Sequence, residues 1–74
     1  MIIKVGNSAY NPKFFRSIHL VEDDDGVMVK IIAVTDRGQK IVLKKVNLIE
    51  SNVANPEAYI LEWFKIYVKM MEEK

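Results

Sequence analysis

The sequence has 74 residues, of which 50% are hydrophobic and 28% are charged, with a formal net charge of +1. This composition is typical of a folded chain, and the length predicts one small domain over residues 1–74. The lack of cysteine excludes disulfides and thiolate metal cages, and the single histidine, His19, leaves little scope for an imidazole zinc site. A net charge near zero gives no overall field to attract nucleic acid or a membrane.

Neither end of the chain has the pattern of a targeting or membrane segment. The apolar start, Met1–Val5, is too short for a signal peptide. Glu62, Lys65 and Lys69 interrupt the longest apolar stretch of the last third, which falls short of the roughly 20 residues of a membrane span. We therefore expect a cytoplasmic protein without membrane contact.

The N-terminal segment reads as two short extended pieces. Residues 1–5 are rich in isoleucine and valine and predict a strand. A turn cluster at 6–8 follows, and residues 9–10 are expected to pair back on the first strand. Asn11-Pro12 turns the chain, since proline fixes its own φ and disfavours the helical region for the residue before it. Residues 13–15 could form one helical turn.

Three longer segments predict an antiparallel meander. Strands are expected over residues 17–22, 27–35 and 39–46, joined by the loop Asp23–Gly26 and the turn Asp36–Gly38. Consecutive strands with short connections pair antiparallel. The prediction is a sheet of three to four strands within about residues 1–48.

A C-terminal helix over about residues 56–72 has the clearest local signal. Asn55 can cap the free amides, Pro56 suits the first helical position, and Glu57 faces the positive end of the helix. Together with the meander, this helix predicts a small α+β fold in which the helix packs on the sheet.

The apolar residues exceed what this fold can bury. The polar residues of the helix form one narrow stripe. Packing on the sheet requires one apolar face of the helix, and the neighbouring face is also apolar, with Tyr59, Trp63, Ile66 and Met70. The central strand is apolar on both faces, with Met28 and Ile32 on the second. These six residues are our candidate protein interface, either in a homodimer or with another protein. The alternative is that a small chain simply exposes some apolar surface.

The acidic run Glu22–Asp25 precedes Gly26 and raises the question of calcium. In the EF-hand pattern the glycine is the sixth loop position, which places Val21 first and Ile32 twelfth, where an acidic ligand and a glutamate are required. A solvated hairpin loop is the better interpretation, and a weak divalent site remains the alternative. We expect no cofactor and no metal.

No catalytic constellation is visible. His19 has neither a second histidine nor a cysteine to work with, the serines lie outside any nucleophile elbow, and the three glycines are scattered rather than gathered in a phosphate-binding loop. We therefore expect no catalytic residues and no enzymatic activity.

Basic residues gather in the second half of the sheet. Residues 26–49 contain five of them against Asp36 alone, a segmental charge of +4; they are Lys30, Arg37, Lys40, Lys44 and Lys45. One interpretation is phosphate contact by the β-hairpin 27–46. The other is edge protection, because lysines on an edge strand block the addition of further strands.

The order of the elements resembles that of small FlbD-like proteins from bacterial flagellar loci and of similar short phage-encoded chains. The resemblance rests on the opening β segment, the break at Asn11-Pro12, the strands ending with Gly38 and Ile41–Leu43, and the closing helix. The chain departs from that pattern in its Asp36–Gly38 turn, its acidic loop and its aromatic helix. The resemblance implies a non-enzymatic accessory protein.

The leading hypothesis is therefore a small protein-interaction module, an accessory, adaptor or inhibitor protein of bacterial or phage type that self-associates. The alternative is a nucleic-acid-binding protein that uses the basic hairpin 27–46.

Overall fold

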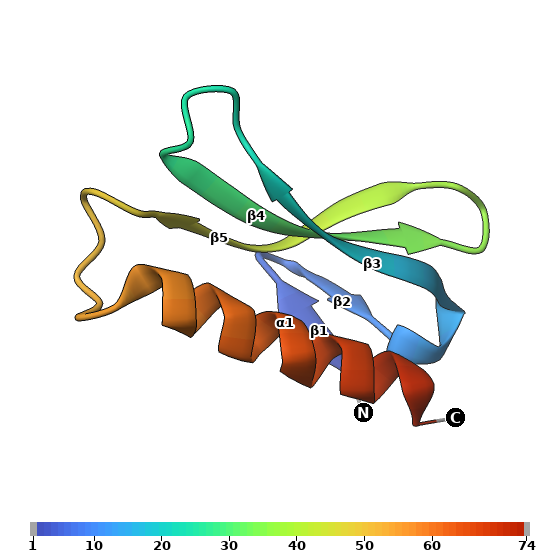
Figure 1. Ribbon diagram of the computed structural model, residues 1–74. Helices are drawn as coiled ribbons and strands as arrows, with labels where there is room; N and C mark the ends of the chain where they lie inside the picture. The colour runs from blue at the N-terminus through green and yellow to red at the C-terminus, as the bar shows by residue number, and fades with distance from the viewer. Residues whose placement is uncertain (1, 74) are drawn as a thin grey trace.

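The computed structural model describes residues 2–73 and consists of a three-stranded antiparallel sheet, a two-stranded hairpin and a C-terminal helix (Figure 1). The elements are β1 (Ile3–Val5), β2 (Ser8–Tyr10), the 3₁₀ turn η1 (Pro12–Phe14), β3 (Phe15–Glu22), β4 (Met28–Thr35), β5 (Lys40–Asn47) and α1 (Pro56–Glu72). The predicted α+β class is confirmed.

The first two strands pair with each other, as predicted. Ile3 faces Tyr10 across the hairpin, and Gly6 has φ +59° in the turn, a conformation that glycine adopts without a steric penalty. These strands form a sheet of their own and do not extend the meander. β1 packs against β5, where Ile3 enters the common core.

The meander has the strand order β3-β4-β5, and its inner face forms the core. Val29, Ile31 and Ala33 of β4 are buried on this face, and Ile31 is completely inaccessible. The alternation predicted for this strand is therefore confirmed. The buried core contains Ile3, Phe15, Ile18, Val29, Ile31, Ala33, Ile41, Leu43, Val46, Ile60 and Tyr67.

The pairing of β4 with β5 contains one irregularity. Ile31 faces Lys44 and Ile32 faces Val42, so Leu43 is an extra residue on β5. Such a bulge lets two neighbouring side chains turn to nearly the same side. Leu43 is buried in the core, and Lys44 also reaches the helix side of the sheet.

Helix α1 starts where the sequence predicts. Asn55 Oδ1 accepts a hydrogen bond from the backbone N of Ala58 at 3.2 Å, and Pro56 occupies the first helical position. The helix lies along one side of the meander (Figure 1) and contacts all three of its strands, and its residues Ile60 and Tyr67 are buried. It covers one face of the sheet.

Candidate interaction surfaces

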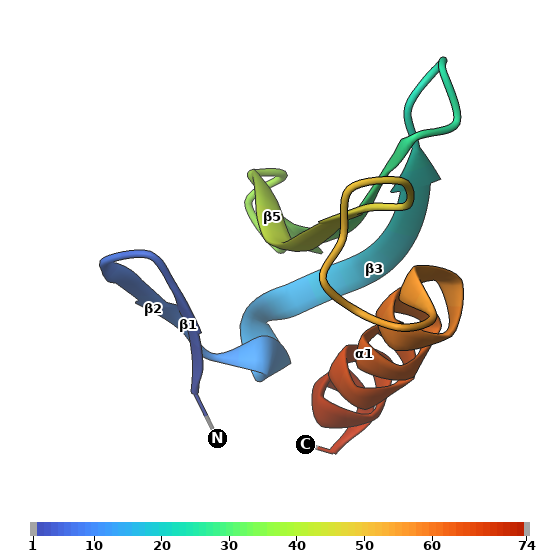
Figure 2. The ribbon, with the colours of Figure 1, turned by 90° about the vertical axis from the view of Figure 1, so that its left-hand side faces the viewer.

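The outer face of the meander is the first candidate site. Figures 1 and 2 show α1 and the β1-β2 hairpin on the same side of the sheet, and no segment of residues 2–73 lies over the other side. The second face of β4, which the sequence predicts to be apolar, is therefore open to solvent. Its residues Met28, Lys30, Ile32 and Val34 are half-buried by their neighbours on the sheet alone.

The strand register gives the layout of this open face. Side chains that face each other across an antiparallel pair lie on the same side of the sheet. His19, Ile32 and Val42 form the central row. On one side of it lie Val21, Lys30 and Lys45, on the other Ser17, Val34 and Lys40, and Met28 extends the surface toward Asn47. We call these residues the open face. Its apolar centre is flanked by three lysines.

The five predicted basic contacts do not form one surface. Lys30, Lys40 and Lys45 lie on the open face, and Arg37 is in the turn beyond it. Lys30 Nζ lies 3.5 Å from Asp23 Oδ1, which partly neutralises it. Lys44 points to the opposite side, where it contacts the helix.

The six predicted interface residues are also divided. Met28 and Ile32 belong to the open face, whereas the other four lie on α1. Of these four, Tyr59, Trp63 and Met70 are half-buried and pack against the core, whereas Ile66 is 39% exposed. The helix thus uses much of its apolar surplus within the chain.

The aromatic residues on α1 surround a lysine. Lys44 Nζ lies 3.8 Å from the centroid of the Trp63 ring and 5.7 Å from that of Tyr59. The rings of Trp63 and Tyr67 pack with their centroids 5.5 Å apart. Burial, with a smaller contribution from nearby Tyr59, raises the pKa of the Tyr67 hydroxyl above its usual value of 10.0.

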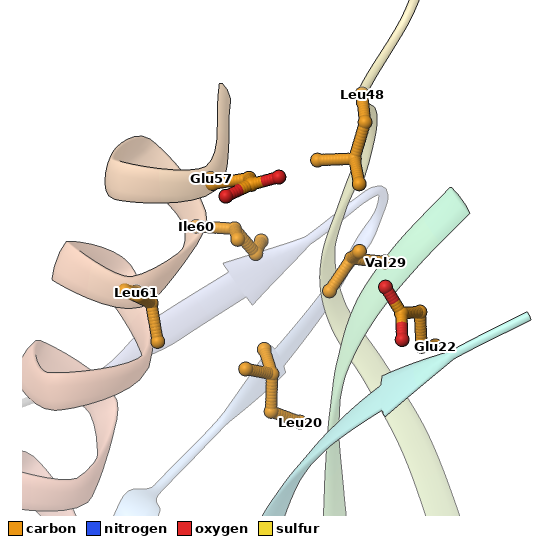
Figure 3. A pocket seen from close by; sticks show the side chains of 7 residues that line it. All are labelled: Leu20, Glu22, Val29, Leu48, Glu57, Ile60 and Leu61. Carbon is orange, nitrogen blue, oxygen red and sulfur yellow. The ribbon is translucent and has the colours of Figure 1, made fainter. Parts of the chain in front are cut away.

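A groove between β3 and the start of α1 is the second candidate site (Figure 3). Its volume is about 260 Å³, and the residues lining it are Leu20, Glu22, Val29, Leu48, Glu57, Ile60 and Leu61. Leu20 and Leu61 remain 38% and 45% exposed, while Val29 and Ile60 form the buried floor. Glu22 and Glu57 add two carboxylates to this apolar groove.

The acidic loop has its own internal contacts. Asp23 contacts Lys30, and Asp25 Oδ1 accepts a hydrogen bond from the backbone N of Val27 at 3.0 Å. Within residues 2–73, no three histidine, cysteine, aspartate or glutamate side chains are grouped so that they could hold a metal ion. The loop is an extension of the β3-β4 hairpin, as the sequence predicts.

The residues predicted from the sequence include none of those that line the groove and only half of those on the open face. Leu20 and Leu61 are exposed leucines on two elements that are distant in sequence, so no local pattern joins them. Likewise, no sequence pattern distinguishes Val21 or Val42 from the other valines of the strands. The sequence does contain one signal for the strand that borders the groove. The first strand of a three-stranded meander is an edge strand, and residues 18–22 contain neither the lysine nor the proline that commonly protects such an edge.

Family models, curated proteins and solved structures give no match to this chain. The resemblance to FlbD-like proteins therefore stays a prediction. Along residues 2–73, no helix combines the length and the apolar character needed to cross a membrane.

Proposed function

We propose that this chain is a small non-enzymatic protein-interaction module that docks through its open face and also self-associates. The observation that carries the docking proposal is the uncovered second face of the meander, where Ile32 and Val42 lie between lysines. Apolar residues in such a surface gain free energy when a partner excludes water from them, at roughly 25 cal/mol per Å².

The partner for the open face is a protein surface with apolar residues and carboxylates. Lys30, Lys40 and Lys45 surround the apolar centre, so an acidic rim on the partner would give electrostatic complementarity. Lysine stems can also pack against apolar side chains while their ammonium groups stay near solvent. A second copy of the same face would instead bring six lysines together, which disfavours a symmetric face-to-face contact.

Nucleic acid is the second candidate partner, favoured by the gathering of three lysines on one face with Arg37 just beyond it. Sheets that bind single strands, however, use aromatic side chains as stacking platforms. The open face consists of aliphatic, polar and basic residues together with His19, and the aromatic rings of Tyr59 and Trp63 lie on the other side of the sheet. Protein is therefore the better-supported partner.

A photo-crosslinking amino acid at Val42 tests this proposal, with the same group at Glu62 on the exposed side of α1 as the matched control. In native lysate, crosslinks to protein should form from position 42, persist after nuclease treatment and disappear when Ile32→Asp is added. Equal crosslinking from both positions would contradict open-face docking. Loss of the crosslinked product after nuclease treatment would favour nucleic acid instead.

A further inference from the structure

We infer that the free edge of β3 pairs antiparallel with β3 of a second copy, which joins two meanders into one six-stranded sheet. This inference specifies how the proposed self-association occurs, and it uses a surface separate from the open face. The occupant of the edge is thus this chain itself, through a two-fold symmetric contact.

The two edges of the meander differ in how they are protected. β5 carries Lys40, Lys44 and Lys45 and is interrupted by the bulge at Leu43, and both features hinder further strand pairing. β3 has an irregularity of its own at Arg16, near its start, but residues 18–22 carry neither lysine nor proline, and their register with β4 is regular. β3 is therefore the edge that can accept another strand.

The backbone groups available on this edge can be assigned. Asp23 N donates to Met28 O at 2.9 Å, so Asp23 directs its amide toward β4. Along an antiparallel strand the residues alternate in the direction of their backbone groups. The N–H and C=O groups of Ile18, Leu20 and Glu22 are therefore directed to the free edge.

A register centred on Leu20 makes this edge complementary to itself. Leu20 then faces Leu20 of the second copy, and Glu22 faces Ile18 of the second copy. No two carboxylates are opposed along the paired strands, and Leu20, which is 38% exposed, becomes covered. Leu61 borders the same groove on α1, so the added strand also shields this leucine.

The charges beyond the paired strands are complementary as well. Arg16, an exposed residue at the irregularity of β3 just outside the paired stretch, then lies at the same end of the contact as Asp24 in the acidic loop of the second copy. The two-fold symmetry produces this arrangement twice. Among the described residues, Arg16 has no salt bridge within the chain.

Analytical ultracentrifugation of the full chain tests the inference. We expect a monomer–dimer equilibrium, and Leu20→Lys should weaken dimerisation by about tenfold or more through lost apolar contact. Val42→Lys is the matched control, because Val42 is 41% exposed but lies on the open face. A wild-type monomer at millimolar concentration, or equal effects of the two variants, would overturn the β3 contact.

Charge reversal tests the register. Arg16→Glu and Asp24→Lys should each weaken the dimer by roughly fivefold, and the double variant should recover most of the affinity.

Disulfide crosslinking is a second test of the register. Leu20→Cys should form a disulfide-linked dimer on oxidation, because paired Cα atoms about 5.5 Å apart lie within disulfide range. Val42→Cys should not. Preferential linkage through position 42 would contradict this register.

Amide hydrogen exchange separates edge pairing from any other dimer. The amides of Leu20 and Glu22 should become protected as the protein concentration rises, while those of His19 and Val21 stay protected by β4 throughout. Concentration-independent exchange at Leu20 in a proven dimer would overturn the inference. These readouts are independent of the crosslink from position 42, so failure of the β3 contact and failure of open-face docking are distinguishable.

Discussion

The ammonium group of Lys44 lies 3.8 Å from the centroid of the Trp63 ring, in the layer between β5 and α1. The position of this lysine results from the bulge at Leu43, which turns Lys44 toward the helix while Lys45 stays on the open face. A cation held above an indole ring is stabilised by the negative face of the ring. Trp63 thus contributes to internal packing, although the sequence predicts it as an interface anchor.

Lys44→Ala should lower the free energy of unfolding by about 1 kcal/mol, since the cation–π contact is partly shielded from water. Lys44→Arg should retain most of the stability, because a guanidinium group can also stack on an indole. Urea denaturation measures both effects. Lys45→Ala is the control and should change stability by less than about 0.5 kcal/mol; an equal loss from the two alanine variants would contradict the contact.

Asn55→Ala should destabilise the fold by about 1 kcal/mol, because the first turn of α1 loses the hydrogen bond from Ala58 N to Asn55 Oδ1. Asn55→Asp should be close to neutral or slightly stabilising, since a carboxylate also caps the positive end of the helix. Thermal melting of the two variants provides the comparison. Indistinguishable melting temperatures would mean that the cap contributes nothing measurable.

Stability should decrease in alkaline solution in a way that depends on Tyr67. Burial raises the pKa of this hydroxyl above 10.0, its value in the unfolded chain, so the folded state favours the protonated form. The resulting stabilisation is fully present below pH 10 and is lost as the pH rises through the folded-state pKa. The unfolding free energy of wild type should therefore fall relative to that of Tyr67→Phe as the pH rises above 10, in a comparison of the two proteins from pH 8 to 11. Parallel curves would argue against a raised pKa.

Binding to DNA or RNA should be negligible near physiological salt. If binding is seen at low salt, its affinity should fall steeply as salt rises, with a slope near the number of phosphate contacts. Arg37→Ala combined with Lys40→Ala should then reduce this slope. Fluorescence anisotropy with labelled oligonucleotides measures the affinity, and sub-micromolar binding at physiological salt would reverse the order of the two proposed partners.

Local patterns predicted the elements themselves. The alternation of Val29, Ile31 and Ala33 indicated a strand with one buried face, and Asn55-Pro56 indicated the start of the helix. Both signals involve only a few neighbouring residues: the strand signal is the alternation of apolar side chains, and the helix signal is a side chain that accepts from the free amides of the first turn. They could therefore be interpreted without knowing which segments meet in space.

The candidate surfaces depended on contacts between distant segments. Strict alternation along β5 could not show that the bulge sends Lys44 to Trp63 and leaves Lys45 on the open face. Nor could the helix pattern decide that Trp63 packs inward while Leu61 stays exposed beside Leu20. A periodic sequence fixes which residues share a face. Which face is covered depends on the register between strands and on the placement of the helix, and both are set by packing the whole core.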